Sequence, residues 1–177
     1  MPENDPIKGT IEKALQINLD TTIYGTIVEI GAGQEVARNF FLAGGAAGTV
    51  AKTMSAYDMT FSDAIYGIEK DKRYVSQSRV RSMVEREFEL VLQRLKNVRD
   101  PNTRYFAFAD TVVARGYRTQ GDCHGWMGLQ FQHKPFSRPS KIIMHLRMKD
   151  NSNHQQQQAW AWLGLTLFYG AFFFVPR

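Results

Sequence analysis

The first third of the chain alternates between helix-like and strand-like spacing of its apolar residues. Residues 22–30 are rich in β-branched side chains and predict a strand. Residues 34–42 predict a helix, which Gly44 and Gly45 end. Before the strand, residues 6–19 predict an amphipathic helix, because apolar side chains recur there every four positions: Ile7, Ile11, Leu15 and Leu19.

The strongest periodicity lies in the middle of the chain. Residues 78–98 predict a long amphipathic helix that Ser78 can cap and Pro101 follows. Its apolar face is formed by Val80, Val84, Phe88, Val91, Leu92 and Leu95. Charged residues occupy the opposite face, as on a solvated helix. Residues 46–59 are ambiguous, and residues 60–75 are expected to be irregular.

The next part of the chain reads as strands. Residues 105–113 are apolar on both sides of the pleat, which is typical of a central strand. Two runs of alternating apolar and polar residues follow, around Leu129 and Met144, and residues 134–140 separate them. They predict an antiparallel hairpin with a long loop. The order of elements predicts a single mixed α/β domain, with a mixed sheet flanked by helices.

An apolar run without any charge occupies residues 159–175. As a helix it would span roughly 26 Å, just short of a bilayer core of roughly 30 Å, so a membrane anchor is one alternative. The favoured interpretation is a buried core element, a helix and then a strand. Residues 1–177 would then be the N-terminal part of a longer protein and a fragment of a larger fold. The remaining chain, or a homo-oligomer partner, would cover the run.

Composition narrows the class of protein. A chain of 177 residues with 44% hydrophobic and 22% charged residues is typical of one soluble domain. The net charge of +5 is not gathered into a dense Lys/Arg block, so no specific nucleic acid is expected as a partner. Cys123 is the single cysteine, and the polar N-terminus is no secretory signal, so a cytoplasmic location is predicted.

The stretch IVEIGAGQE, residues 27–35, offers the first candidate site. A strand that leads through Gly-x-Gly into a helix can place backbone N–H groups at the positive end of the helix dipole, where anions bind. The predicted cofactor-binding residues here are Glu29, Gly31, Gly33 and Gln34. The alternative is a tight turn without a ligand.

The same stretch resembles the first motif of S-adenosylmethionine-dependent methyltransferases, an acid followed by Gly-x-Gly. The resemblance implies that the loop would hold the methionine part of that cofactor, although Glu35 stands at the usual third glycine position. Nucleotide-binding βαβ units also place an acid at the end of the second strand. Asp58 is the nearby candidate, but the segment before it is a poor strand by its residues.

A second glycine-rich segment, AGGAAGTVAKT, spans residues 43–53. A phosphate loop of the Walker type needs a lysine directly after its last glycine, and Lys52 stands four positions after Gly48, so that motif is excluded. A looser role near an anionic group is expected for Gly45, Gly48 and Thr49, close to the first glycine loop. The alternative is that these small residues allow close packing.

Three residues are candidates for catalysis. Cys123 and His124 lie in a polar segment between two strands and could supply a nucleophile or a metal ligand. Adjacent side chains on an extended chain point in opposite directions, so the two would not form a dyad. Asp110 lies within an apolar strand and is the leading candidate for an acid or base, or for a structural hydrogen-bond acceptor. No spacing of ligands predicts a metal site.

Four strings together resemble a little-characterised bacterial family whose members are often labelled nicotinate-nucleotide (or nicotinamide mononucleotide) adenylyltransferase: EIGAGQEVARNFF, AGTVAKTMSAYDMTFSDAIYG, RYFAFADTVVAR and CHGWMGLQFQ. The resemblance covers residues 24–173 and implies adenylyl transfer, with ATP and nicotinate mononucleotide as ligands. Family members continue beyond this length. The H-x-G-H motif of true adenylyltransferases is absent here, where the corresponding place reads GAGQ, so no functional residue is carried over.

Three functions follow as hypotheses. The first is a protein that binds a nucleotide or another anionic cofactor, and that is a transferase if it is an enzyme. The second is cofactor binding like that of S-adenosylmethionine-dependent methyltransferases. The third is a non-catalytic structural or assembly protein that uses the same glycines for packing.

Overall fold

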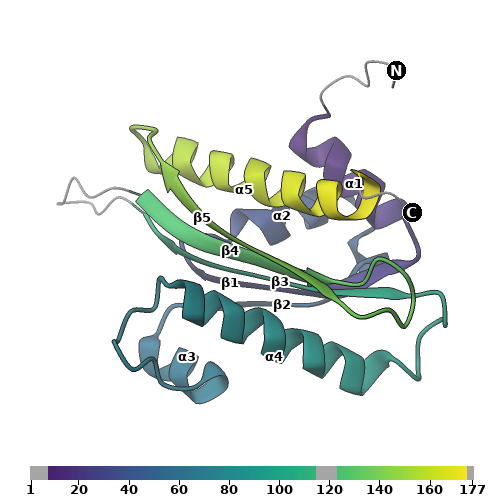
Figure 1. The fold of residues 1–177 in the computed structure, drawn as a ribbon. Helices are drawn as coiled ribbons and strands as arrows, with labels where there is room; N and C mark the ends of the chain where they lie inside the picture. Colours follow the sequence, from purple (N-terminus) through teal and green to yellow (C-terminus); the bar gives the residue numbers. More distant parts are fainter. Residues whose placement is uncertain (1–7, 115–122, 175–177) are drawn as a thin grey trace.

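A computed structural model describes residues 8–114 and 123–174. Helices and strands follow one another along the chain in an α/β order (Figure 1). The elements are α1 (Thr10–Leu19), β1 (Ile23–Gly31), α2 (Glu35–Ala43), the 3₁₀ turn η1 (Ala46–Gly48), β2 (Val50–Ala56), α3 (Met59–Tyr66), α4 (Gln77–Leu95), β3 (Arg104–Val113), β4 (Cys123–Phe131), β5 (Ser140–Met148), α5 (Asn153–Tyr169) and the π turn η2 (Gly170–Phe174).

The five strands form one mixed sheet in the order β2-β1-β3-β4-β5. Strands β2, β1 and β3 are parallel, whereas β4 is antiparallel to both of its neighbours. Helices α1, α2 and α5 cover one side, called here the α5 face, and α3 and α4 lie on the other, the α4 face (Figure 1). The predicted single α/β domain with a mixed sheet flanked by helices is confirmed, as is the antiparallel β4–β5 hairpin.

The path of the chain reverses at β1. The connection from β1 to β2 passes through α2 on the α5 face, and the connection from β2 to β3 returns through α4 on the α4 face (Figure 1). Strands β2 and β3 therefore lie on opposite sides of β1. In open α/β sheets, ligands bind outside the carboxyl ends of the strands at such a switch point. The topology thus places the residues that follow β1 where this class of fold binds its ligands.

Three elements in the first half of the chain, β2, α3 and α4, differ from the sequence prediction. The ambiguous residues 46–59 contain β2, an edge strand whose side chains are mostly exposed, so no apolar alternation marks it. Residues 60–75 are not wholly irregular, because α3 ends at Tyr66. The Asp58 carboxylate caps this helix by accepting a hydrogen bond from the Phe61 amide. Helix α4 begins earlier than expected, and Ser76 rather than Ser78 caps it.

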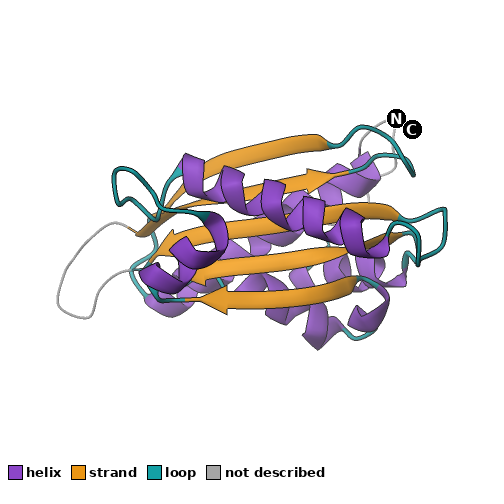
Figure 2. Cartoon of the chain, turned by 90° about the horizontal axis from the view of Figure 1, so that it is seen from below, coloured by secondary structure: helices purple, strands orange, loops and turns teal. Residues whose placement is uncertain are grey.

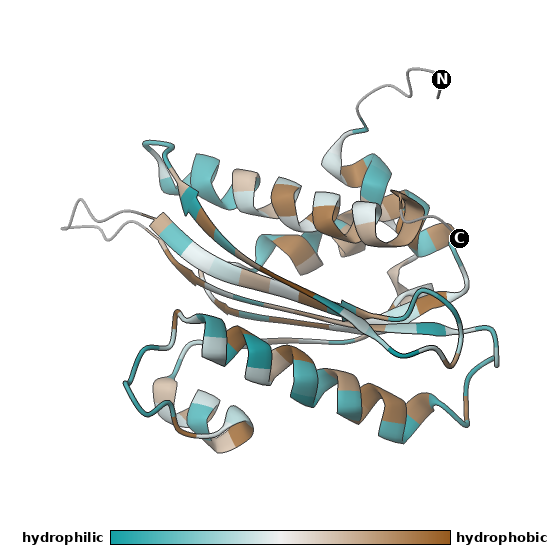
Figure 3. Ribbon diagram, in the orientation of Figure 1, coloured by the Kyte–Doolittle hydropathy of each residue, from teal (hydrophilic) through white to brown (hydrophobic). Residues whose placement is uncertain are grey.

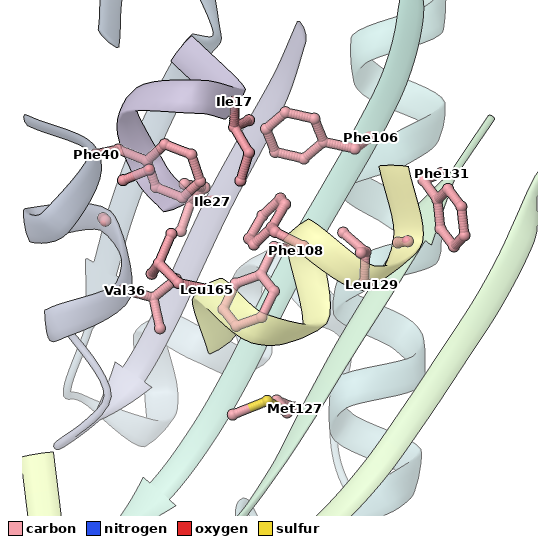
Figure 4. Packing of buried hydrophobic residues seen from close by; sticks show 14 of the residues in the cluster. Ile17, Ile27, Val36, Phe40, Phe106, Phe108, Met127, Leu129, Phe131 and Leu165 are labelled. Atoms are coloured by element: carbon pink, nitrogen blue, oxygen red, sulfur yellow. The ribbon is translucent and has the colours of Figure 1, made fainter. Parts of the chain in front are cut away.

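The main core lies on the α5 face and is rich in aromatic rings (Figure 4). Phe168 of α5 packs edge-on against Phe106 of β3 and Phe40 of α2, with ring centroids 5.0 and 5.1 Å apart. Each pair adds about 0.5–1.5 kcal/mol beyond the area that it buries. These contacts hold α2 and α5 in place above β1 and β3.

Residues 159–174 form no strand, contrary to the expected helix followed by a strand. Helix α5 starts at the Ser152 cap and continues into η2. Its residues change from hydrophilic at the start to hydrophobic toward the end (Figure 3). Gly164 lets α5 approach α2, because a Cβ there would lie 2.6 Å from Val36 Cγ2. Within the described ranges, no helix is long and apolar enough to cross a membrane.

Candidate functional site

The glycine loop, residues 31–34, and the end of β2 lie next to each other at the carboxyl ends of the parallel strands. In the β1–β2 pair, Ile30 lies opposite Ala56, so Tyr57 and Asp58 emerge beside the residues that follow β1. In the β1–β3 pair, Gly31 lies opposite Val112. Gly31 has a φ of +81°, which favours glycine, and a Cβ there would lie 2.3 Å from the Val112 carbonyl oxygen. The loop therefore closes tightly over the end of β3.

Glu29 occupies the amino end of α2. Its Oε1 accepts a hydrogen bond from the Val36 amide at 3.1 Å, and its Oε2 accepts one from the Ala37 amide at 3.2 Å. The residue at the N-cap position, Gln34, makes no capping hydrogen bond with its side chain. Glu29 thus performs the capping from the preceding strand and satisfies two N–H groups that an anionic ligand would otherwise use.

Asp110 lies next to Glu29 across the β1–β3 pair and on the same face of the sheet. Its Oδ2 accepts a 2.8 Å hydrogen bond from the indole N–H of Trp160 on α5. Asp110 is fully buried, and Glu29 is 3% exposed. Burial raises the pKa of Glu29 to about 8, and burial, together with the charge of Glu29, raises the pKa of Asp110 well above its ordinary value. At least one of the two carboxyl groups therefore holds a proton at neutral pH.

Gly33 lies directly against this carboxyl pair. A Cβ at position 33 would lie 2.2 Å from Asp110 Oδ1 and 2.7 Å from its Cγ. Asp110 cannot retreat, because it is buried and bonded to Trp160. The inner side of the loop is therefore packed shut, which favours the tight-turn alternative for Gly31 and Gly33, while Gln34 stays exposed on the outer side.

We expect Gly33→Ala to lower the free energy of unfolding by about 1–3 kcal/mol, because the added methyl group overlaps the Asp110 carboxyl. Urea denaturation of the purified protein measures the change. The matched control is Gly48→Ala, where the nearest atom to the added Cβ, the Asn18 carbonyl oxygen, is 3.5 Å away. Equal losses in the two variants would show that contact with Asp110 is not the cause.

The second glycine segment lies at the opposite end of the parallel strands, beside their amino ends. Thr49 directly precedes β2, and its carbonyl accepts a hydrogen bond from the Gly25 amide near the start of β1. Six strand residues, or roughly 20 Å, separate this point from Gly31. The expectation that Gly45, Gly48 and Thr49 lie close to the first glycine loop is therefore wrong. They precede β2, whereas the loop follows β1, and parallel strands have their amino ends on one side of the sheet and their carboxyl ends on the other.

The sheet separates Cys123 from His124. Cys123 is 3% exposed within the core on the α5 face, and burial raises the pKa of its thiol, which disfavours the nucleophilic thiolate. His124 points to the α4 face, where its ring lies 5.6 Å from that of His145. As expected, the two form no dyad. Among the described residues, no cluster of His, Cys, Asp and Glu can hold a metal ion.

Three cavities lie away from the predicted site residues, one of them of about 260 Å³ beside Tyr105 and Gln132. A groove of about 820 Å³ runs between α1, α2 and the start of α5, and Arg38, His154 and Trp162 are among the residues that line it. A smaller cavity of about 180 Å³ lies between β2 and α4, beside Lys52 and Glu87. None of the predicted site residues lines any of the three cavities.

Sequence reasoning missed the partnership of Glu29, Asp110 and Trp160. Glu29 and Asp110 were identified separately, and only the β1–β3 register brings them together. Trp160 lies in the apolar run and carries no local signal of a polar role. The acid expected after a second strand is present, because Asp58 follows a real parallel strand, β2.

Comparisons with known proteins identify the fold. No protein-family model matches the chain, and no curated protein matches it. A competence/damage-inducible protein, CihA, from Agrobacterium tumefaciens superposes with a TM-score of 0.64 at 18% identity, over 93% of this chain and 96% of that one. A CinA superfamily protein from Enterobacter cloacae gives 0.65 at 11%, over 93% of both chains. A further CinA superfamily protein from Escherichia coli gives 0.59 at 13%, over 96% and 92%.

These neighbours correct the family expected from the sequence. The chain has the fold of competence/damage-inducible proteins of the CinA superfamily, and the resemblance to a family labelled nicotinate-nucleotide adenylyltransferase is wrong. The absence of an H-x-G-H motif agrees with this correction. The continuation of the chain beyond residue 177 stays a prediction.

Proposed function

We propose that this protein binds a small ribose-containing ligand, a nucleoside or nucleotide, at the carboxyl edge of β1 and β2. One observation carries the proposal: a β1–α2–β2 unit places a glycine loop and Asp58 side by side at the switch point of the sheet. An acid at the end of the second strand is the group that binds ribose hydroxyls in dinucleotide-binding folds. Asp58 is exposed, and only its Oδ1 is engaged in capping α3.

The Glu29 carboxyl group at the amino end of α2 limits which part of the ligand can face this helix. Glu29 already accepts hydrogen bonds from the Val36 and Ala37 amides, so a phosphate cannot use them. A phosphate group, if the ligand has one, lies away from the amino end of α2. S-adenosylmethionine, which has a ribose and no phosphate, is the specific alternative. Asp110 is covered by Gly33, so the proposal concerns binding and assigns no reaction.

Calorimetric titration with adenosine, ATP and S-adenosylmethionine tests this proposal. Asp58→Asn keeps a side-chain oxygen for the α3 cap but loses the charge, so we expect affinity to fall about tenfold to a hundredfold with the melting temperature unchanged. Asp71→Asn, which changes an exposed acid on the α3–α4 connection, is the control. No heat with any of the three ligands, or equal losses in both variants, would contradict the proposal.

An assembly role is the second candidate, supported by exposed apolar side chains around α3. Tyr57 is 71% exposed, Met59 59%, Phe61 57% and Ile68 80%. Apolar side chains grouped in this way mark interaction surfaces more often than isolated ones do. Light scattering over a concentration series tests self-association through them. Loss of a concentration-dependent oligomer in Phe61→Ser would support assembly, and a monomer at every concentration would exclude a homo-oligomer.

A further inference from the structure

Strand β5 carries a row of positively charged or chargeable side chains on one face. Lys141, His145 and Arg147 are separated by even numbers of positions, so they project to the same side of the sheet, with Ile143 between the first two, and Lys149 continues the row just beyond the strand. This row, Lys141, His145, Arg147 and Lys149, is called the basic stripe. It lies on the α4 face, since Lys141 contacts Glu85 of α4. His145, Arg147 and Lys149 are exposed.

Helix α4 leaves the basic stripe accessible. Seen from below, α4 runs obliquely across the sheet, and most of the edge strand β5 lies to one side of it (Figure 2). Lys141 forms an ion pair with Glu85. Among the residues that the structure describes, no carboxylate forms an ion pair with Arg147 or Lys149. Arg147 and Lys149 therefore present positive charge to solvent without an ion-pair partner within the described ranges, whereas Glu85 neutralises the charge of Lys141.

Aromatic rings lie beside these charges. The indole ring of Trp126 on β4 stacks on the His145 imidazole, with centroids 4.6 Å apart and planes inclined by 26°. His124 meets His145 edge-on, and Arg147 lies opposite His124 in the β4–β5 register. Trp126 is partly exposed. Flat rings beside cations along one strand are the arrangement that single-stranded nucleic acids use, because bases stack on the rings and phosphates contact the cations.

We propose that the α4 face of β4 and β5 binds single-stranded nucleic acid without sequence preference. Trp126 and His145 form the stacking platform, and Arg147 and Lys149 contact phosphates. An acidic peptide would satisfy the cations but leave the stacked rings without a partner, so the aromatic pair favours nucleic acid. This surface lies at the opposite edge of the sheet from β2, so it is independent of the ribose site proposed above.

Fluorescence anisotropy with a fluorescein-labelled oligothymidylate tests the electrostatic part. We expect the double variant Arg147→Gln/Lys149→Gln to bind about tenfold more weakly. The slope of log K against log salt should fall by roughly 0.7 for each phosphate that the variant no longer neutralises. The control double variant, Arg38→Gln/Arg73→Gln, removes the same charge from side chains that are 65% and 80% exposed elsewhere. Equal losses of affinity in both would overturn the assignment of the surface, as would a lack of binding at low salt.

A second comparison tests stacking. The wild-type protein should prefer the oligothymidylate to an abasic strand of equal length by about tenfold, and Trp126→Leu should lose that preference. The ratio is measured within each folded variant, so a change in stability does not imitate the effect. Circular dichroism checks that each variant is folded. A wild-type protein that binds the abasic strand, or heparin, as tightly as the oligothymidylate would overturn the proposal.

Discussion

Replacing Arg79 with methionine is expected to lower the free energy of unfolding by about 3–5 kcal/mol. Arg79 is fully buried on α4, and its guanidinium contacts Asp63 at 2.7 Å and Glu69 at 3.5 Å. Tyr74 lies against the guanidinium and also donates a hydrogen bond to Asp63. Methionine keeps most of the side-chain volume but leaves two largely buried carboxylates without a cation. The loss comes from these unpaired charges rather than from a cavity.

Urea denaturation at neutral pH measures this change. The control is Arg73→Met, since Arg73 is 80% exposed and its contact with Asp71 is 4.0 Å long, so we expect less than about 0.5 kcal/mol. The triple variant Arg79→Met/Asp63→Asn/Glu69→Gln should recover part of the loss, because it removes the carboxylate charges as well. Equal effects of Arg79→Met and Arg73→Met would show that the buried cation does not hold α3 against α4.

Stability is expected to fall as the pH rises from about 4.5 to about 8 because of the Glu29–Asp110 pair. Burial raises the pKa of Glu29 from 4.5 to about 8, so the folded protein holds a proton that the unfolded chain has released in this window. Stability is then lost with increasing pH, by up to about 1.4 kcal/mol per pH unit for one proton, and levels off above pH 8. Below pH 4.5 the group is protonated in both states and contributes no slope.

The variants Glu29→Gln and Asp110→Asn isolate this contribution. Each removes one of the two carboxyl groups whose pKa is raised in the folded protein, so the slope should become smaller by the share of that group, while burial of the remaining carboxyl keeps the rest. His145 acts in the opposite direction, because partial desolvation of its ring, together with the nearby His124 and Arg147, lowers its pKa, and stability therefore rises as the pH increases. Denaturation at several pH values, with Glu89→Gln on the exposed side of α4 as control, compares the slopes. A wild-type slope retained in both variants would refute a shared proton.

The sequence predicted those helices and strands in which buried positions recur regularly, because burial then produces a regular pattern of apolar residues. Helix α4 has one buried face, and β3 is buried on both, so periodicity revealed each of them. Strand β2 lies at the sheet edge with mostly exposed side chains, and α3 exposes Met59 and Phe61, so neither repeats an apolar pattern. Their formation depends on pairing with β1 and on the ion pairs of Arg79, which are contacts between distant parts of the sequence.

The candidate site was located in part. The glycine loop lies at the switch point, but Glu29 takes the amides that were expected to bind an anion. The amide groups at a helix end are either free or bound by a side chain of the same protein. Which of the two holds depends on the direction of that side chain, which residue spacing does not reveal. The basic stripe was missed for a related reason. Its basic residues are interspersed with apolar residues along β5, so they are sparse in the sequence but lie on one surface of the sheet.

The hydrogen bond between Trp160 and Asp110 also has a consequence for synthesis in the cell. The two residues are 50 positions apart, and translation at 5–20 residues per second separates them by about 3–10 s. During that interval the residues of β3 have been synthesised, but those of α5, the helix that covers it, have not. The nascent chain must carry an uncovered row of phenylalanines and an unpaired carboxyl group, so a codon change that slows translation between β5 and α5 would prolong its exposure to aggregation.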